Sequence, residues 1–303
     1  MDFIDLHTHT CYSDGTSTVE NSLKCADKLE LSLFSVTDHN TVDAYDEIDS
    51  LRYLFRGDIL PGVELSTVFY VEVIEVLGYG INIVEMKKLI GKNYMSFYDK
   101  QVAKARIDTQ NLLKKGAVLS DDFIRDMCEN PERIFDPNHD TNRSYLLEEL
   151  RRHSENAVFF ASRSEFETIN EQQFTRQYLF NAESSLYSDQ SSLGPDLECV
   201  LNMIHDCGGL AFLAHVFLYS DNVLKRLDEF CGNGTDGLEC WYGTFTNEQK
   251  VFLSDFCDEC GLYKSGGSDF HGPGMRAQNV MGYSGGDRIL MQPWMRDIKN
   301  RYI

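Results

Sequence analysis

Two histidines lie one residue apart near the start of the chain, in the segment DLHTHTCYSDG (residues 5–15). Histidine is scarce, with eight residues in 303, so this spacing is notable. On a β-strand, residues i and i+2 project from the same face. His7 and His9 would therefore point together from the end of a strand, where two imidazoles can chelate one metal ion, and Asp14 follows on a glycine turn. By itself the spacing fits two hydrogen-bonded surface histidines equally well.

Four further segments place a residue of metal-ligand type at or just after an apolar, strand-like run. They are TDHNT with His39, PGVEL with Glu64, LAHV with His215, and GGSDFHG with Asp269 and His271. In parallel α/β barrels, the carboxyl ends of the strands form the active-site face. Histidines scattered through a core or a surface would not occupy this position five times, so the pattern predicts a metal centre. His139, His153 and His205 lie in polar or helical contexts and are expected to be solvated.

The elements that would position these residues alternate along the chain. We expect strands at 3–6, 33–39, 58–65 and 68–80, a helix at 19–31, and further strands at 209–216, 236–241 and 262–269. Such alternation indicates βαβ units around a parallel sheet. Residues 86–194 are mostly helical and charged, and the clearest helix, 96–116, is ended by Gly116. We therefore predict a barrel-like α/β domain formed by residues 1–85 and 195–303 and interrupted by a helical insertion at 86–194.

The charge of the chain limits its partners. Lys and Arg number 28 against 48 Asp and Glu, so the net charge is −20. Stable binding to duplex nucleic acid or to an anionic membrane needs a basic surface and is not expected. A phosphorylated substrate remains possible, because bound metal cations can reverse the local field. The chain shows no membrane-spanning apolar run and no secretory signal, and its nine cysteines are irregularly spaced, which together favour a cytoplasmic protein.

The ordered motifs resemble those of the PHP (polymerase and histidinol phosphatase) family of metal-dependent phosphoesterases, in particular its small stand-alone members with a helical insertion. The resemblance rests on DLHTHTCYSDG, SVTDHNT, PGVELST, LAHV and GGSDFHG, which occur in the family's order. It implies a distorted seven-stranded β/α barrel with two or three divalent ions, either manganese, zinc or iron. Following the family, one ion would be held by His7, His9, Glu64 and Asp269, a second by Asp14, His39 and His271, and a third by Glu64 and His215. Asp269, His271, His39 and Asp14 would form the catalytic centre.

The chain departs from the family pattern after the Glu64 strand. The family often reads H-x-L-G-Y there, whereas this chain reads EVLGY and has Glu75 at the histidine's position. Glu75 would share a strand face with Val71, Val73 and Leu77, where a carboxylate is costly unless it is paired or binds metal. We expect Glu75 to ligate the third ion. The alternatives are that this site is weak or empty, or that Glu75 pairs with a cation elsewhere.

The insertion carries a weaker match. NRSYLLEEL (142–150) resembles a family segment, keeps Arg143 as a candidate phosphate clamp, and has Tyr145 where the family has a histidine. Both residues are therefore candidates for substrate binding. Asp5 shares a strand face with His7 and is expected to orient a ligand imidazole.

The resemblance implies an enzyme that hydrolyses phosphate esters of nucleotides or of short nucleic-acid ends through a metal-bound hydroxide. Two divalent ions can activate the nucleophile and neutralise the phosphoryl oxygens. Two alternatives remain open. Amidohydrolases, which cleave C–N bonds, also use H-x-H on a first strand, but they usually carry a bridging lysine that we do not find in a motif here. The other is a metal-binding regulator that has lost catalysis.

Overall fold

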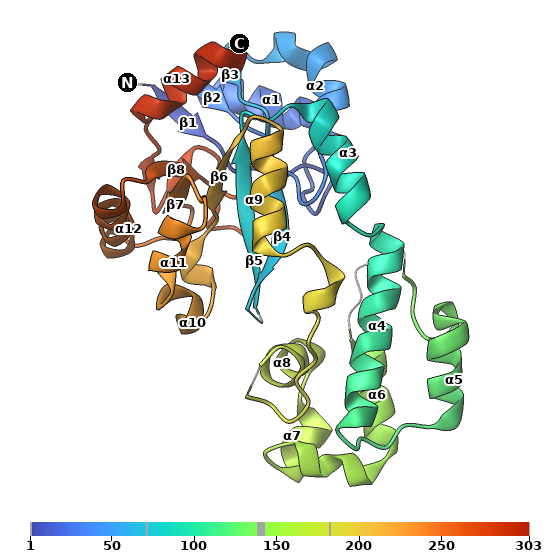
Figure 1. The fold of residues 1–303 in the computed structure, drawn as a ribbon. Helices are drawn as coiled ribbons and strands as arrows, with labels where there is room; N and C mark the ends of the chain where they lie inside the picture. Colours follow the sequence, from blue (N-terminus) through green and yellow to red (C-terminus); the bar gives the residue numbers. More distant parts are fainter. Residues whose placement is uncertain (1, 71, 138–142, 182, 303) are drawn as a thin grey trace. The chain divides into compact units, whose positions relative to one another are not determined.

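The computed structural model describes residues 2–70, 72–137, 143–181 and 183–302. The chain divides into two compact units, Met1–Asn93 with Pro195–Ile303, and Tyr94–Gly194 (Figure 1). The division follows helix α3 (Ile83–Asn93), which packs against α9 (Leu197–Asp206) of the first unit. The structure thus assigns α3 to the first unit, whereas the sequence pattern suggested that the insertion starts at residue 86. In the described part of the chain, no helix is both long and apolar enough to cross a membrane.

The first unit has an α/β fold with two main sheets. One sheet is parallel and has the order β1-β2-β3; the other has the order β4-β5-β6-β7-β8. In the larger sheet β4, β5 and β6 pair antiparallel, and only β6, β7 and β8 pair parallel. The expectation of an all-parallel sheet is therefore wrong for its first half. The strands are β1 (Phe3–Asp5), β2 (Leu31–Phe34), β3 (Asp58–Ile59), β4 (Gly62–Phe69), β5 (Glu72–Tyr79), β6 (Leu210–Leu213), β7 (Gly237–Tyr242) and β8 (Tyr263–Gly267), with a hairpin of β9 (Tyr283–Ser284) and β10 (Asp287–Arg288).

The expected seven-stranded barrel is not confirmed, because the described strands form two open sheets rather than one closed sheet. The sheets are linked by isolated parallel bridges, Thr8 with Phe270 and His39 with Glu64. The run 58–65, expected as one strand, is split at Leu60–Pro61 into β3 and β4, which belong to different sheets. Proline lacks an N–H for a sheet ladder, which suits this break.

Helices cover the sheets of the first unit, and their ends carry ordinary capping signals. In α12 the Thr246 hydroxyl and the Gln249 side chain form a capping box, and Gly261 ends the helix with φ of +69°. In α1 the Thr18 side chain accepts a hydrogen bond from the N–H of Asn21. The helices of this unit, besides α3 and α9, are α1 (Val19–Lys28), α2 (Tyr45–Leu51), α10 (Asp221–Leu224), α11 (Leu227–Gly232), α12 (Asn247–Cys260) and α13 (Pro293–Tyr302).

One hydrophobic core joins both sheets of the first unit. It combines Ile4 and Leu33 of the parallel sheet with Leu77 and Phe212 of the larger one, and α13 contributes Trp294. The Trp294 ring stacks on Phe212 at a centroid distance of 4.8 Å. This core fixes the strands, and hence the segments that follow them, in one rigid frame.

The second unit is helical and has its own core. It contains α4 (Phe97–Lys114), α5 (Asp121–Glu129), α6 (Ser144–Arg152), α7 (Arg163–Thr168) and α8 (Glu171–Phe174). Leu112, Met127, Leu146 and Phe174 are fully buried in a core separate from that of the first unit. The longest helix, α4, has Ser96 as its N-cap, and the chain leaves it through Gly116 at φ of +88°.

Candidate metal centre

The segments after β1 and β8 run side by side and bring four predicted ligands together. The N–H of Asp269 donates to the His7 carbonyl at 2.8 Å, and the N–H of His9 donates to the Phe270 carbonyl at 2.9 Å. Gly267 allows this approach, because a Cβ there would lie 2.1 Å from the Cβ of His7. His7 and His9 therefore face Asp269 and the neighbouring His271.

His39 and Glu64 are joined by the second bridge between the sheets. The Asn40 N–H donates to the Glu64 carbonyl at 2.8 Å, next to the parallel bridge between His39 and Glu64. Glu64 is the third residue of β4, so the expectation that it ends a strand is wrong. It nevertheless meets the other ligands, because the end of the segment after β2 lies against the start of β4.

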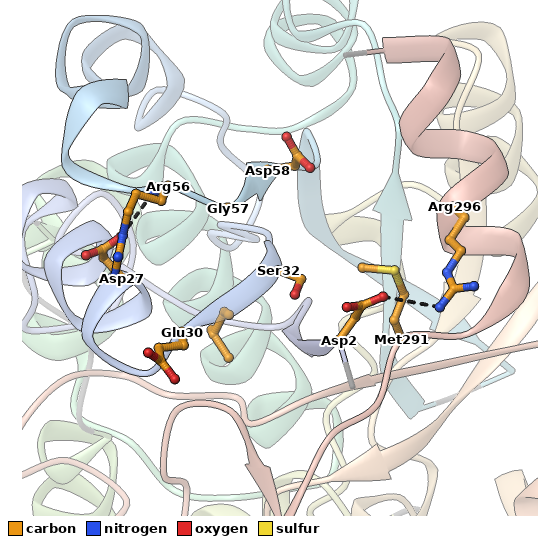
Figure 2. A pocket seen from close by; sticks show the side chains of 10 residues that line it. Asp2, Asp27, Glu30, Ser32, Arg56, Gly57, Asp58, Met291 and Arg296 are labelled. Carbon is orange, nitrogen blue, oxygen red and sulfur yellow. Dashed lines mark hydrogen bonds and ion pairs between the residues drawn. The ribbon is translucent and has the colours of Figure 1, made fainter.

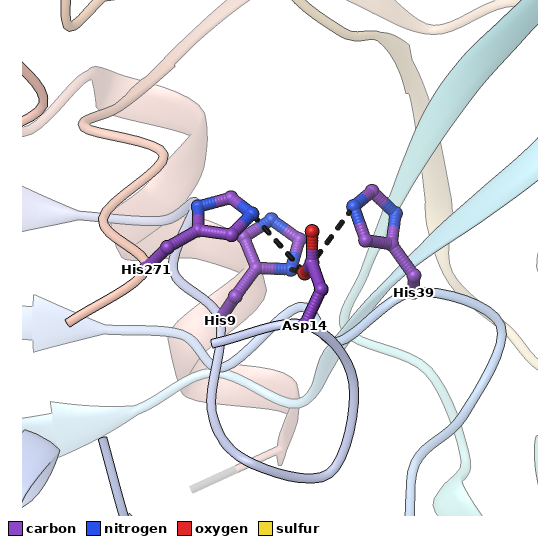
Figure 3. A group of neighbouring side chains, drawn as sticks. All are labelled: His9, Asp14, His39 and His271. Carbon is purple, nitrogen blue, oxygen red and sulfur yellow. Dashed lines mark ion pairs between the residues drawn. The ribbon is translucent and has the colours of Figure 1, made fainter. Parts of the chain in front are cut away.

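All nine residues predicted to bind metal occur in groups whose donor atoms lie within 4.8 Å of one another. Figure 3 shows the group whose side chains surround the Asp14 carboxylate. Glu64 belongs to two groups and so connects them. The groups are His9, Asp14, His39 and His271; His7, His9 and Asp269; His7, Glu64 and His215; and His39, Glu64 and Glu75.

Several of the converging donor atoms are buried and have no hydrogen-bond partner in the described residues, which leaves them available to divalent ions. Glu64 Oε2 lies 3.2 Å from the Nε2 atoms of both His7 and His9 and 3.1 Å from His39 Nδ1. It is fully buried, yet it makes no hydrogen bond. His271 Nε2, 3.1 Å from Asp14 Oδ1, is likewise buried without a hydrogen bond. Buried polar atoms rarely lack partners, and a mixed nitrogen and carboxylate set suits zinc, manganese or iron.

The pKa shifts within the cluster also indicate a site that favours a cation. Burial alone would lower the pKa of His9, but the carboxylates of Asp269 and Glu64 close to its ring raise it to about 9. Burial is outweighed in the same way at His215, where Glu64 and Glu75 raise the pKa to about 10. Burial would raise the pKa of Glu64, but the imidazoles of His7 and His39 hold it well below its usual range. The carboxylates thus favour positive charge at this point, and a metal ion would compete with protons for the same atoms.

This chain is similar to known proteins over most of its length. The model of the PHP domain matches residues 5–176, more than half of the chain. The chain belongs to the PHP domain family. It is 26% identical over 303 residues to a 3′,5′-nucleoside bisphosphate phosphatase of Chromobacterium violaceum, covering 99% of this chain and 98% of that protein. It is 25% identical to a 5′-3′ exoribonuclease of Haemophilus influenzae, covering 89% and 90% of the two chains.

Solved structures share the fold of this PHP protein. One is described as an amidohydrolase from Chromobacterium violaceum, with a TM-score of 0.62 and 23% identity over 98% of this chain and 96% of that one. Another, from Bifidobacterium adolescentis, has been proposed to be a metal-dependent phosphoesterase and gives a TM-score of 0.61 at 22% identity over 100% and 97%. At this identity both comparisons concern the fold alone.

Glu239 contacts two of the predicted ligands, His7 and His215, and was not itself predicted from the sequence. Its Oε1 lies 2.9 Å from His7 Nδ1, and its Oε2 accepts the His215 N–H at 2.8 Å. It is fully buried in β7. A hint existed in the segment DGLECW, where an acidic residue interrupts an apolar strand.

Asp5, predicted to orient an imidazole, has another role. It accepts hydrogen bonds from the N–H groups of Ser268 and Gly282 at 2.9 and 2.7 Å and from the Ser268 hydroxyl at 2.6 Å. Its contact with His7 is to the backbone N–H, not to the ring. Burial raises the pKa of Asp5 to about 6 against these hydrogen bonds. Asp5 therefore fixes the segment that leads from β8 to the predicted ligands Asp269 and His271.

Replacing Glu239 by alanine is expected to weaken metal binding by about 10–100-fold, the usual effect of losing a carboxylate that orients a ligand histidine. The change removes the partners of His7 Nδ1 and of the His215 N–H. Titration calorimetry with manganese measures the affinity, and Glu239→Gln, which retains an acceptor, should lose less. Unchanged affinity in Glu239→Ala would show that Glu239 does not support the ligands.

Glu75 lies beside the other predicted ligands of the third site. In the β4–β5 pairing, Glu75 is opposite Ser66. Ser66 is two residues from Glu64 along β4, so Glu75 and Glu64 lie on the same face of the sheet. Glu75 Oε1 is 3.2 Å from His39 Nδ1 and its Oε2 is 3.2 Å from His215 Nε2. The expected apolar face holds only in part, since Val73 is exposed and Val71 lies outside the described residues. No lysine or arginine pairs with Glu75 among the residues that the structure describes.

Replacing Glu75 by histidine is expected to shift metal preference from manganese or magnesium towards zinc, because nitrogen replaces a hard oxygen donor. Competitive metal binding and thermal unfolding together test this. Unfolding free energy should change little. A decrease of about 3–5 kcal/mol in the unfolding free energy, the usual cost of leaving a buried charge without its partner, would instead favour an ion-pair role for Glu75.

The two candidate substrate-binding residues of the insertion belong to the second unit. Arg143 Nε donates to Asp108 Oδ2 at 2.8 Å, and its guanidinium lies over Phe180. Tyr145 stacks on Phe135 with centroids 4.8 Å apart. These contacts give both residues a packing role, and substrate binding by either stays a prediction. His139 lies outside the described residues.

A separate cavity of about 680 Å³ lies where β1, β2 and β3 begin, and none of the nine predicted metal-binding residues lines it (Figure 2). Its two arginines are already paired, Arg56 Nε with Asp27 at 2.9 Å and Arg296 Nη2 with Asp2 at 3.2 Å. No histidine or cysteine lines it. This cavity is therefore not a candidate for the metal chemistry.

Proposed function

We propose that this protein is a metal-dependent phosphoesterase that hydrolyses phosphate esters of nucleotides or of short nucleic-acid ends. The observation that carries the proposal is the convergence of nitrogen and carboxylate donors around Glu64, whose buried Oε2 has no hydrogen-bond partner. The relatives named as a nucleoside bisphosphate phosphatase and as an exoribonuclease support the substrate class, because both act on phosphate esters of nucleotides. The number of ions, two or three, and their identity as manganese, zinc or iron belong to the proposal.

In this proposal, His7, His9, Glu64 and Asp269 hold one ion; Asp14, His39 and His271 hold a second; and His215 and Glu75 complete a third position with Glu64. When bound, such ions supply charge neutralisation for the phosphoryl oxygens and lower the pKa of water. Glu239 keeps His7 and His215 oriented. Asp38 positions the loop with Asp14, since it accepts hydrogen bonds from the Thr10 N–H and the Ser13 hydroxyl at 2.7 and 2.6 Å.

The alternative of C–N bond cleavage has less support. The amidohydrolase description of one structural neighbour is matched here only by the fold. Lys264, in β8, donates to the Ser254 hydroxyl at 2.8 Å and pairs with Asp258 at 2.7 Å. Its side chain therefore contacts α12 rather than the predicted metal ligands. A non-catalytic regulator would not need so complete a donor set.

A substrate panel with measured metal content tests the proposal. The purified protein, supplied with manganese, should release phosphate from nucleoside monophosphates or 3′,5′-bisphosphates, or shorten RNA or DNA oligonucleotides from their ends. Elemental analysis should find at least two ions per chain. A fully metal-loaded protein that turns over none of these esters would contradict the proposal and favour the regulator.

A further inference from the structure

Arg276 lies at the metal centre and was not singled out by any sequence motif. Its Nη1 hydrogen-bonds to Asp269 Oδ2, and its Nη2 is 3.7 Å from Asp14 Oδ2. The side chain is 43% exposed. Apart from histidines, it is the only cation that forms an ion pair with Asp14, Glu64, Glu75 or Asp269 in the described residues.

The two oxygens of Asp269 have separate surroundings. Oδ1 faces the ligand nitrogens, at 3.1 Å from His9 Nε2 and 3.4 Å from His7 Nε2. Oδ2 accepts the Tyr242 hydroxyl at 2.7 Å and the Asn279 amide at 3.4 Å, besides Arg276. Since Tyr242 and Asn279 already hold Oδ2, orienting Asp269 does not by itself require a partly exposed arginine.

The backbone around Arg276 is built to hold it in place. Arg276 has φ of +39°, which is uncommon for a residue other than glycine, and it follows Gly272 and Gly274 at +100° and +85°. The Asn279 N–H donates to the Arg276 carbonyl at 2.8 Å, and the Asn279 side chain donates to the Asp269 carbonyl at 3.3 Å. The turn is thus tied to a predicted metal ligand, and such strained conformations often occur at functional sites.

We infer that Arg276 binds a phosphoryl oxygen of the substrate beside the metal ions. This inference deepens the proposed function and rests on it. A guanidinium has five N–H donors in a planar fork that matches phosphate. One hydrogen bond, to Asp269, is made within the described residues, so most of the donors remain for a ligand. In a chain of net charge −20, a fixed cation at this point offsets the acidic surroundings that an anionic ester would meet.

The competing role is positioning: Arg276 would only neutralise Asp14 and Asp269. The two roles separate in a phosphate-binding experiment that needs no turnover. Inorganic phosphate is titrated into the manganese-loaded full chain, with Arg276→Ala, Arg276→Gln and Arg276→Lys compared with wild type. Arg226→Ala is the matched control, since Arg226 is a similarly exposed arginine of the same unit that pairs with Glu229 and lies over Tyr70. Bound metal is measured in every sample.

For Arg276→Ala and Arg276→Gln, phosphate affinity should fall about tenfold or more, as for loss of a charge-assisted hydrogen bond. Metal content should stay at the wild-type level, Arg276→Lys should recover part of the affinity, and KM for an active ester should rise more than kcat falls. Arg276→Lys keeps the charge and provides the comparison if the alanine variant does not fold. An affinity within about twofold of wild type, or a loss of metal that accounts for the weaker binding, overturns the inference. Absence of ester turnover in wild type would refute the proposed function, while phosphate affinity would still report on Arg276.

Discussion

Asp269→Asn is expected to reduce phosphoesterase turnover by about 10³-fold or more, because it weakens a charged donor to ions that supply several kcal/mol of transition-state stabilisation. Asp269 Oδ1 faces His7 and His9, while Asp269 Oδ2 accepts a hydrogen bond from the Tyr242 hydroxyl. Asparagine has nearly the same shape, so the hydrogen bond from Tyr242 can persist and the fold should survive. Steady-state kinetics with a nucleotide ester and circular dichroism measure both effects.

His9→Ala should produce the same loss, since His9 belongs to two of the donor groups. Two matched controls are Asp287→Asn, an exposed carboxylate on β10, and His205→Ala, a histidine paired with Asp236 outside the centre. Both should keep near wild-type turnover. Full activity in both Asp269→Asn and His9→Ala would rule out the proposed metal mechanism.

Removing the metal is the second change with a large expected effect. Treatment with a chelator should abolish turnover, and manganese should restore it. The native state should also lose stability, because a ligand at about 100 times its Kd stabilises the folded protein by about 2.7 kcal/mol. The cluster gives a structural reason, since Glu64, Glu75, Asp14 and Asp269 gather at one place, and among the described residues Arg276 is the only cation other than histidine that pairs with them.

Thermal unfolding with and without manganese, together with elemental analysis, tests this prediction. Metal binding should weaken as the pH falls, because protons compete for imidazole and carboxylate donors. Full turnover by protein shown to be metal-free would contradict the proposal, whereas an unchanged unfolding midpoint after metal loss would contradict only the stability prediction.

Local spacing in the sequence was enough to predict which residues gather in the donor groups. Two pairs of residues lie two positions apart beside a strand end: His7 with His9, and Asp269 with His271. Residues at this spacing project from the same face of a strand, so the pattern can be recognised in the sequence. Their supporting residues carry no such pattern. Glu239, Asp38, Tyr242 and Arg276 reach the centre through tertiary folding, and a single acidic or aromatic residue within or beside a strand has many ordinary explanations.

The sheet direction was predicted less well, for a local reason. The chain turns between β4 and β5 at Tyr70, which has φ of +56°, although tyrosine is not a residue that signals such a turn. Without glycine or asparagine at that point, the runs 58–65 and 68–80 looked like separate parallel strands. The start of the helical unit also differs from the prediction, lying at Tyr94 rather than at residue 86. The helical pattern of α3 does not reveal which unit the helix packs against.

Hydrogen bonds between the first residues of the chain and residues far along it have a consequence for the order of synthesis. The hydrogen bonds of His7 with Glu239 and of Asp5 with Gly282 join residues 232 and 277 positions apart. A growing chain that has reached residue 176, the end of the family match, has made the first histidine pair but neither Glu239 nor the second pair. On the ribosome, His7 and His9 are therefore synthesised before the insertion, and their partners Glu239 and Asp269 are synthesised after it. The insertion has its own core and can fold during that interval, so the metal centre would be completed after the insertion.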